Sequence, residues 1–246
     1  MDDQNIYQEQ EFSECCEELR SLYTQELNHI RNRCADFLYK HSFLQAQSVL
    51  SVIGKPYWET YHSLLIKYVL ENQNGGKVLH GFLKSIDVEV TWLDSVLNQQ
   101  YKVEVEHTIL NQRYKSWNGK RIDLLICDDV NKWLIVVENK ILSSVRYSTG
   151  NRTQLEIYHC YCENNKRWDG YDKVYVLLDY KDRSDNYEDW VLANYINLFS
   201  AILANKPEDS VVEDYLRTLY SILSPIDKMV TLADITLFNT EIIEKI

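Results

Sequence analysis

The chain has 246 residues, of which 45% are hydrophobic and 12% aromatic, and its formal net charge is −11. This composition supports a buried core, and the presence of only seven glycines and three prolines excludes a low-complexity or disordered chain. The acidic balance counts against a protein that holds duplex nucleic acid over a broad basic face. Any contact with nucleic acid has to be local or supplied by a partner.

The sequence contains no segment approaching the roughly 20 apolar residues that a membrane-spanning helix needs. Residues 1–20 are acidic and polar where a secretory signal is basic and then apolar. The six cysteines lack the spacing of a zinc site. We therefore expect a cytoplasmic protein with reduced thiols and no membrane partner.

The hydrophobic periodicity predicts helices first and strands afterwards. Helical spacing runs from about Glu11 to Leu50, and more helices are predicted over residues 57–72, 77–86 and 92–100. Alternating or β-branched segments then predict strands over residues 101–109, 120–127, 133–140 and 173–180. A helix is expected over residues 151–165, between the last two strands, and C-terminal helices are expected over residues 190–206 and 211–223.

This order of elements indicates an α/β fold. A strand, a crossover helix and a second strand imply at least one parallel pairing, so we expect a mixed sheet flanked by helices. No linker divides the chain. We expect a single domain with a helical extension over residues 1–48, a core over 49–204 and C-terminal helices over 205–246.

The stretch "RIDLLICDDVNKWLIVVENKI" combines two apolar strands with charged residues near their outer ends. An antiparallel hairpin folded about Val130 and Asn131 places Asp123 opposite Glu138, with Cβ atoms about 4.5 to 5.5 Å apart. Period-two alternation places Lys140 on the same face as Glu138. Two carboxylates this close repel each other unless a cation lies between them.

Two interpretations of this cluster remain open. A divalent metal would neutralise the carboxylates more completely than one lysine, and Mg²⁺ favours one or two carboxylates together with waters and a phosphate. The cluster would then be a metal site that the substrate completes. Alternatively, the three residues form a solvated salt-bridge cluster at the rim of the sheet, which contributes little to stability.

Asp123 followed by Glu138-Asn139-Lys140 resembles the D…(D/E)xK signature of the PD-(D/E)XK nuclease superfamily, with Ile122 in place of the proline. The segments "WETYHSLLIKYVLENQNGGKVLHGFLKSI", "GKRIDLLI", "IVVENKI" and "QLEIY" are similar, in order, to those of one uncharacterised branch. The similarity extends from about Val49 to Ala204.

The resemblance implies a restriction-endonuclease-like fold and a nuclease that depends on Mg²⁺ or Mn²⁺. It assigns catalysis to Glu59, Asp123, Glu138, Lys140 and Gln154, and Tyr158 also matches. It assigns the metal to Asp123, Glu138, Glu59 and the Asn139 carbonyl. The expected partner is nucleic acid, with DNA favoured over RNA. The expected biological role is defence against foreign DNA.

Other residues near the hairpin are ambiguous. Glu104 and Glu106 share a face by alternation, and neither register nor motif decides whether they reach the site. The histidines His62, His107 and His159 are expected to be packing or surface residues. Basic and aromatic residues around the hairpin form either a groove for a short or single-stranded substrate or ordinary loop surface: Arg113, Tyr114, Lys115, Trp117, Lys120, Arg121, Arg146, Tyr147, Arg152, Lys166 and Arg167.

A second hypothesis belongs to a different class. The strong negative charge and the 18 tyrosines are also compatible with a catalytically silent module that keeps the fold and binds a protein partner.

Overall fold

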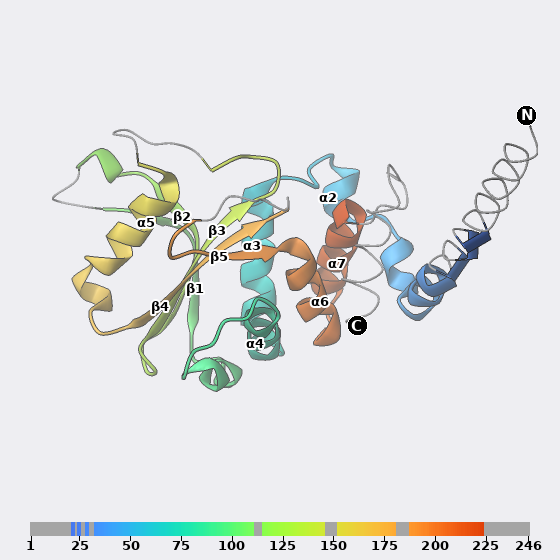
Figure 1. Cartoon of the computed structure of the whole chain (residues 1–246), viewed down its shortest axis with the longest axis horizontal. Helices are drawn as coiled ribbons and strands as arrows, with labels where there is room; N and C mark the ends of the chain where they lie inside the picture. Colours follow the sequence, from blue (N-terminus) through green and yellow to red (C-terminus); the bar gives the residue numbers. More distant parts are fainter. Residues whose placement is uncertain are drawn as a thin grey trace, which may run out of the picture. The chain divides into compact units, whose positions relative to one another are not determined.

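The computed structural model describes residues 21–22, 24–25, 28–29, 32–110, 115–145, 152–180 and 187–223 (Figure 1). The chain divides into two compact units, Met1–Gln45 with Ser224–Ile246, and Ala46–Leu223. In the first unit residues 32–40 are helical and the 3-10 helix η1 (Ser42–Gln45) follows. The parts of the predicted terminal helices before residue 21 and after Leu223 lie outside the described residues.

The second unit contains the sheet. Its helices are α2 (Val49–Val52), α3 (Glu59–Glu71), α4 (Gly75–Ser85), α5 (Gln154–Glu163), α6 (Tyr195–Ala204) and α7 (Ser210–Leu223), and its 3-10 segments are η2 (Leu93–Asn98), η3 (Lys115–Trp117) and η4 (Lys166–Trp168). Its strands are β1 (Lys102–Thr108), β2 (Arg121–Asp128), β3 (Trp133–Lys140), β4 (Asp172–Asp179) and β5 (Val191–Asn194).

The strands form one mixed sheet in the order β1-β2-β3-β4-β5. The β1–β2 and β2–β3 pairs are antiparallel, and the β3–β4 and β4–β5 pairs are parallel. The prediction of a mixed α/β sheet flanked by helices is therefore confirmed. The helix α5 is the crossover that makes the parallel β3–β4 pairing sterically feasible.

The predicted hairpin register is confirmed, because Leu124 pairs with Val137. The turn is fixed by Asp128, whose Oδ1 accepts the backbone N–H groups of Val130 and Asn131 at 2.8 and 2.9 Å. This side-chain capping of a turn is a common role of aspartate. It sets the register of the charged residues at the other end of the hairpin.

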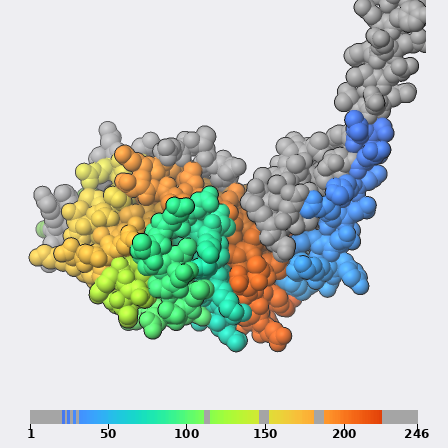
Figure 2. Space-filling model, turned by 60° about the horizontal axis from the view of Figure 1, so that its bottom comes forward, coloured from blue at the N-terminus to red at the C-terminus, as the bar shows by residue number. Residues whose placement is uncertain are grey.

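Helices cover both faces of the sheet (Figure 1). On one face Leu125 and Val136 pack with Tyr158 of α5. On the other face Leu124 and Val137 lie beside side chains of α3, α4 and α6. Because both faces are buried, the central strands are almost continuously apolar, and the charged residues at their ends stand out. On the surface in Figure 2, α4 and η2 (green) lie between α5 (yellow) and α6 and α7 (orange to red).

One predicted helix is partly wrong. Residues 191–194, expected to be helical, form β5, which pairs with β4, and α6 begins only at Tyr195. The helix starts there because Asn194 and Asn197 form a capping box. A four-residue strand running directly into an apolar helix is too short for its period to be recognised.

The breaker at Gly75 and Gly76 ends α3 as predicted, but it also begins α4. A Cβ on Gly75 would lie 1.9 Å from the backbone oxygen of Leu70, so only glycine fits this close approach. Within the described residues, no helix has the length and apolar character needed to cross a membrane.

Candidate active site

The two acidic residues of the hairpin face each other at its open end. The last assigned pair of the β2–β3 ladder is Leu124–Val137, so the next positions, Asp123 and Glu138, are opposite. Lys140 forms an ion pair with Glu138 through Oε1, as alternation along β3 requires. Glu138 is fully buried, and the ammonium group of Lys140 is the partner of its Oε1.

Glu59, the first residue of α3, ties this helix to the end of β3. Its Oε1 accepts the backbone N–H of Ile141 at 2.9 Å and the hydroxyl of Ser143 at 2.7 Å. Its Oε2 lies 4.0 Å from Lys140 Nζ. Glu59 therefore adds a third carboxylate near the ammonium group of Lys140.

Asn139 also connects the end of β3 to the start of α3, through hydrogen bonds within the core. Its Nδ2 donates to Glu59 O and to Ser63 Oγ, both at 3.1 Å, and Tyr195 donates its hydroxyl to Asn139 Oδ1. Its backbone N–H donates to Asp123 Oδ2 at 2.8 Å. Since the N–H and C=O of one strand residue point to the same side, the Asn139 carbonyl also faces Asp123.

Burial dominates the electrostatics of the carboxylates. It raises the pKa of Asp123 to about 6, with Lys140 and the Asn139 N–H opposing the shift and Glu59 and Glu106 adding to it. Burial, followed by the charge of Asp123, also raises the pKa of Glu138 well above its ordinary value.

The ammonium group of Lys140 responds in the opposite sense. Burial favours its neutral form, but the charges of Glu138, Asp123 and Glu59 outweigh this and raise the pKa of Lys140. The lysine is therefore charged, and one ammonium group is shared among three carboxylates.

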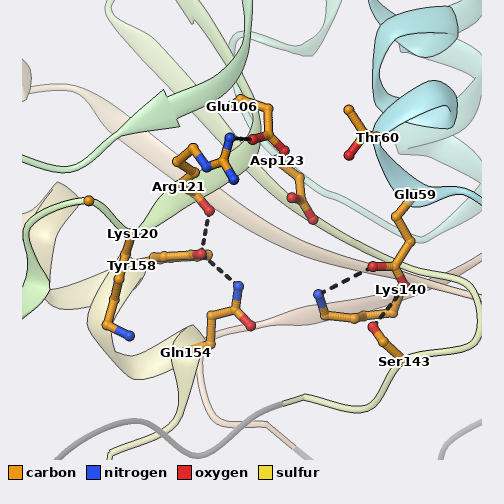
Figure 3. Close-up of a pocket in the computed structure, with 11 residues that line it drawn as sticks. Glu59, Thr60, Glu106, Lys120, Arg121, Asp123, Lys140, Ser143, Gln154 and Tyr158 are labelled. Carbon is orange, nitrogen blue, oxygen red and sulfur yellow. Dashed lines mark hydrogen bonds and ion pairs between the residues drawn. The ribbon is translucent and has the colours of Figure 1, made fainter.

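Gln154 begins α5, and Tyr158 orients its amide. The Tyr158 hydroxyl donates to the backbone carbonyl of Arg121, which can only accept. The phenol oxygen consequently accepts from Gln154 Nε2 at 2.6 Å. The other end of the amide, Oε1, is left as an acceptor pointing away from Tyr158 (Figure 3).

These groups surround an open pocket of about 430 Å³ at the end of the sheet opposite to the β2–β3 turn (Figure 3). The predicted residues Glu59, Asp123, Lys140 and Gln154 line it, together with Tyr158. Glu138 lies buried behind this lining, and the Asn139 side chain is committed to the core. The hairpin and two helices thus bring together residues that are distant in sequence.

Glu106 and Arg121 also line the pocket and form an ion pair with each other, although neither belongs to the predicted catalytic set. Of the two glutamates of β1 that the sequence left open, Glu106 lines the pocket and Glu104 does not. Glu106 has a left-handed backbone with φ of 57°, and Glu104 instead accepts from His107 at 2.7 Å. A left-handed glutamate within a strand has no recognisable sequence signal. The presence of Ser143 at the pocket could not be predicted from the sequence either, because its contact with Glu59 depends on tertiary packing.

The expected basic and aromatic groove is supported only in part. Lys120 and Arg121 line the pocket, but Trp117 is 5% exposed and packs in the core. Trp117 is therefore not available as a stacking surface, because it is buried in the core cluster that also contains residues of β2 and α5. Four residues of the proposed groove lie outside the described part of the chain: Arg113, Tyr114, Arg146 and Tyr147.

The histidines have packing contacts. Burial lowers the pKa of His62 to about 4, so this ring is neutral. Its Nε2 donates to the Pro56 carbonyl at 2.8 Å, and its Nδ1 accepts from Tyr215 at 3.2 Å. His107 is bonded to Glu104, and His159 lies 3.6 Å from Asp189.

The donor set fits a metal only as an incomplete site. Within the described residues, no group of three or more His, Cys, Asp or Glu side chains is arranged to hold an ion. Asp123 and Glu138 nevertheless face each other, the Asn139 carbonyl points toward Asp123, and Glu138 Oε2 is buried without a hydrogen-bond partner of ordinary geometry among the described residues. Two carboxylates and a carbonyl suit Mg²⁺, which keeps several waters and takes further oxygen ligands from a phosphate.

A family model described as the PD-(D/E)XK nuclease superfamily matches residues 47–231. No curated protein and no solved structure is significantly similar to the chain. The matched region includes the mixed sheet, its flanking helices and the hairpin that carries Asp123, Glu138 and Lys140. The chain therefore belongs to the PD-(D/E)XK nuclease superfamily.

Proposed function

We propose that the protein is a metal-dependent nuclease that hydrolyses phosphodiester bonds of DNA or RNA in the pocket beside the hairpin. One observation carries the proposal: Asp123 and Glu138 are opposed at the edge of an open pocket, with the ammonium group of Lys140 against them. A salt-bridge cluster at a solvated rim does not explain this arrangement, because Glu138 is fully buried and Lys140 is only 6% exposed.

Mg²⁺ or Mn²⁺ would be held by Asp123, Glu138 and the Asn139 carbonyl. When bound, such an ion polarises a phosphoryl oxygen and lowers the pKa of water. The pKa values of both carboxylates are raised mainly by burial, and a bound cation would favour their charged forms. Glu59 is assigned to orienting Lys140, because Ile141 and Ser143 already occupy its Oε1.

The remaining roles follow from charge and hydrogen-bonding capacity. Lys140 is a compact positive charge and would stabilise the negative charge that develops on the phosphoryl group. Gln154 Oε1 can only accept, so it would orient the attacking water, and the second N–H of Nε2 could donate to a phosphate. Both partners expected from the sequence therefore stay open for Gln154.

The test is cleavage of single- and double-stranded DNA and RNA in Mn²⁺, with an EDTA arm. We expect the wild type to cleave DNA and the Lys140→Ala variant to be at least about 100-fold slower, the range for losing one charged stabilising group. Lys67→Ala is a matched control, because this lysine lies on α3 and pairs with Glu71 at 3.7 Å outside the pocket. Equal cleavage by wild type and Lys140→Ala would reject the proposal in favour of a catalytically silent protein-binding module.

A further inference from the structure

Two neighbouring basic residues stand at the rim of the pocket. Lys120 and Arg121 both line it, and the Arg121 side chain is 60% exposed. Its guanidinium group forms an ion pair with Glu106, from the adjacent strand β1 (Figure 3). The rim therefore carries a positive charge that is partly neutralised by the protein's own carboxylate.

The backbone of Arg121 is fixed from two sides. Its carbonyl accepts the hydroxyl of Tyr158, and the preceding carbonyl, of Lys120, accepts the N–H of Ile109 at 2.8 Å. Arg121 also lies only two residues before Asp123 in β2. The guanidinium group can consequently move by side-chain rotation alone, and it remains within reach of whatever enters the pocket.

Glu106 is held in an unusual conformation that brings its carboxylate to this rim. Its φ of 57° lies in the left-handed region, and the β1–β2 register is the same on both sides of it. Glu106 therefore lies across from Asp123 without a regular pairing. Backbone strain of this kind persists only where the surrounding structure enforces it, and it concentrates at functional sites.

The ion pair between Glu106 and Arg121 is one in which another anion can replace the carboxylate of Glu106. Ion pairs at the protein surface contribute little to stability, and here the Arg121 side chain is 60% exposed and the Glu106 side chain 26%, so the pair can open at small cost. A guanidinium group binds carboxylate and phosphate with the same planar arrangement of donors, and a phosphodiester can therefore replace Glu106 without loss of pairing.

We propose that Arg121 anchors a phosphate of the nucleic-acid substrate next to the bond that is cleaved, and that Glu106 is a positioning residue that holds the guanidinium group at the rim until the substrate displaces it. This inference rests on the proposed nuclease function and deepens it. It predicts opposite effects for the two partners, because Arg121 supplies the contact and Glu106 competes with it.

The test is fluorescence anisotropy with a short labelled single-stranded DNA in EDTA, at several salt concentrations. Arg121→Ala weakens binding at least about 10-fold and reduces the slope of log K against log salt by about 0.7, the value for one phosphate contact on a single strand. Glu106→Gln tightens binding about threefold or more, and Arg121→Lys retains part of the affinity. In the Glu106→Gln/Arg121→Ala double variant the tightening disappears, as expected for residues that act through one contact.

The pair Glu104–Arg167 provides a matched control. Glu104 lies on the same strand as Glu106, and its Oε1 is 3.5 Å from Arg167, but neither residue lines the pocket. Glu104→Gln and Arg167→Ala make the same changes of charge, and we expect each to shift the affinity less than about twofold.

The possible failures are distinguishable. If the wild type cleaves DNA but Arg121→Ala binds normally, or if Glu106→Gln weakens binding, this inference is overturned and the proposed function stands. If the wild type neither binds nor cleaves nucleic acid, both are overturned.

Discussion

Asp123 Oδ2 accepts the backbone N–H of Asn139 at 2.8 Å, one step beyond the last regular pair of the β2–β3 ladder. The carboxylate thus takes the place of a backbone acceptor where the two strands separate. This contact fixes the side chain of Asp123 beside Glu138 and explains how a charged group is accommodated within an apolar hairpin. The acidic pair is therefore arranged before any ligand binds.

The first prediction concerns the pH dependence of stability without metal. The pKa of Asp123 is raised from 3.8 to about 6, so the folded protein binds more protons than the unfolded chain across this interval. Stability therefore falls as the pH rises from about 4 to about 6 and stays lower above it. Asp123→Asn removes this contribution, and we expect the variant to be more stable at neutral pH by up to about 3 kcal/mol.

Urea unfolding in EDTA at a series of pH values measures this effect. The amide oxygen of the variant can still accept the Asn139 N–H, so the comparison isolates the charge. The explanation fails if wild type and Asp123→Asn lose stability in parallel between these pH values.

The second prediction concerns the buried pair Glu138–Lys140. Lys140→Met leaves a fully buried carboxylate without its cation and should cost about 3 kcal/mol of unfolding free energy. Adding Glu138→Gln should recover most of this loss, because no unpaired charge then remains buried. Chemical denaturation of Lys140→Met, of Glu138→Gln and of the double variant gives the coupling free energy between the two residues. Additive losses would show that the ion pair is not the source of the cost.

The third prediction concerns the hydrogen bond between Tyr195 and Asn139. Tyr195→Phe leaves Asn139 Oδ1 buried without its donor, at a cost of about 1 to 3 kcal/mol. Because Asn139 holds the start of α3, cleavage should fall as well. Tyr101→Phe is the control, since it removes a buried bond of 2.8 Å to Leu70 O away from the pocket. Equal losses of activity in both variants would indicate general destabilisation.

The fourth prediction concerns the orientation of Gln154. In Tyr158→Phe the Gln154 amide loses the partner that fixes its direction, and we expect kcat to fall about 10-fold. Gln154→Ala should cost a similar factor, and the double variant should be little worse than either single one. Cleavage rates at saturating DNA test this. Multiplicative losses would show that the two residues act independently.

The hairpin was predictable from sequence because its register follows from alternation and from a turn at Val130 and Asn131, whereas the role of Asp128 in fixing that turn became visible only in the structure. The position of Glu59 needed the family resemblance, since nothing in a helical period shows that the first residue of α3 reaches the end of β3. Glu106 could not be assigned, because neither register nor motif decided between Glu104 and Glu106, and a left-handed backbone at Glu106 has no sequence signal. The sequence placed Trp117 in a binding groove, but the composition of a segment with basic and aromatic residues does not show whether the aromatic side chain is buried or exposed.

Calorimetric titration with Mn²⁺ measures whether the pocket beside the hairpin binds a divalent ion. We expect the wild type to bind the ion with micromolar affinity, and Asp123→Asn to bind it at least about 10-fold more weakly, since changing even a residue that only supports a metal ligand costs about 10- to 100-fold. Glu163→Gln, which removes a carboxylate on α5 outside the pocket, should bind like the wild type. Identical Mn²⁺ affinities for the wild type and Asp123→Asn would show that Asp123 is not a ligand of the metal ion.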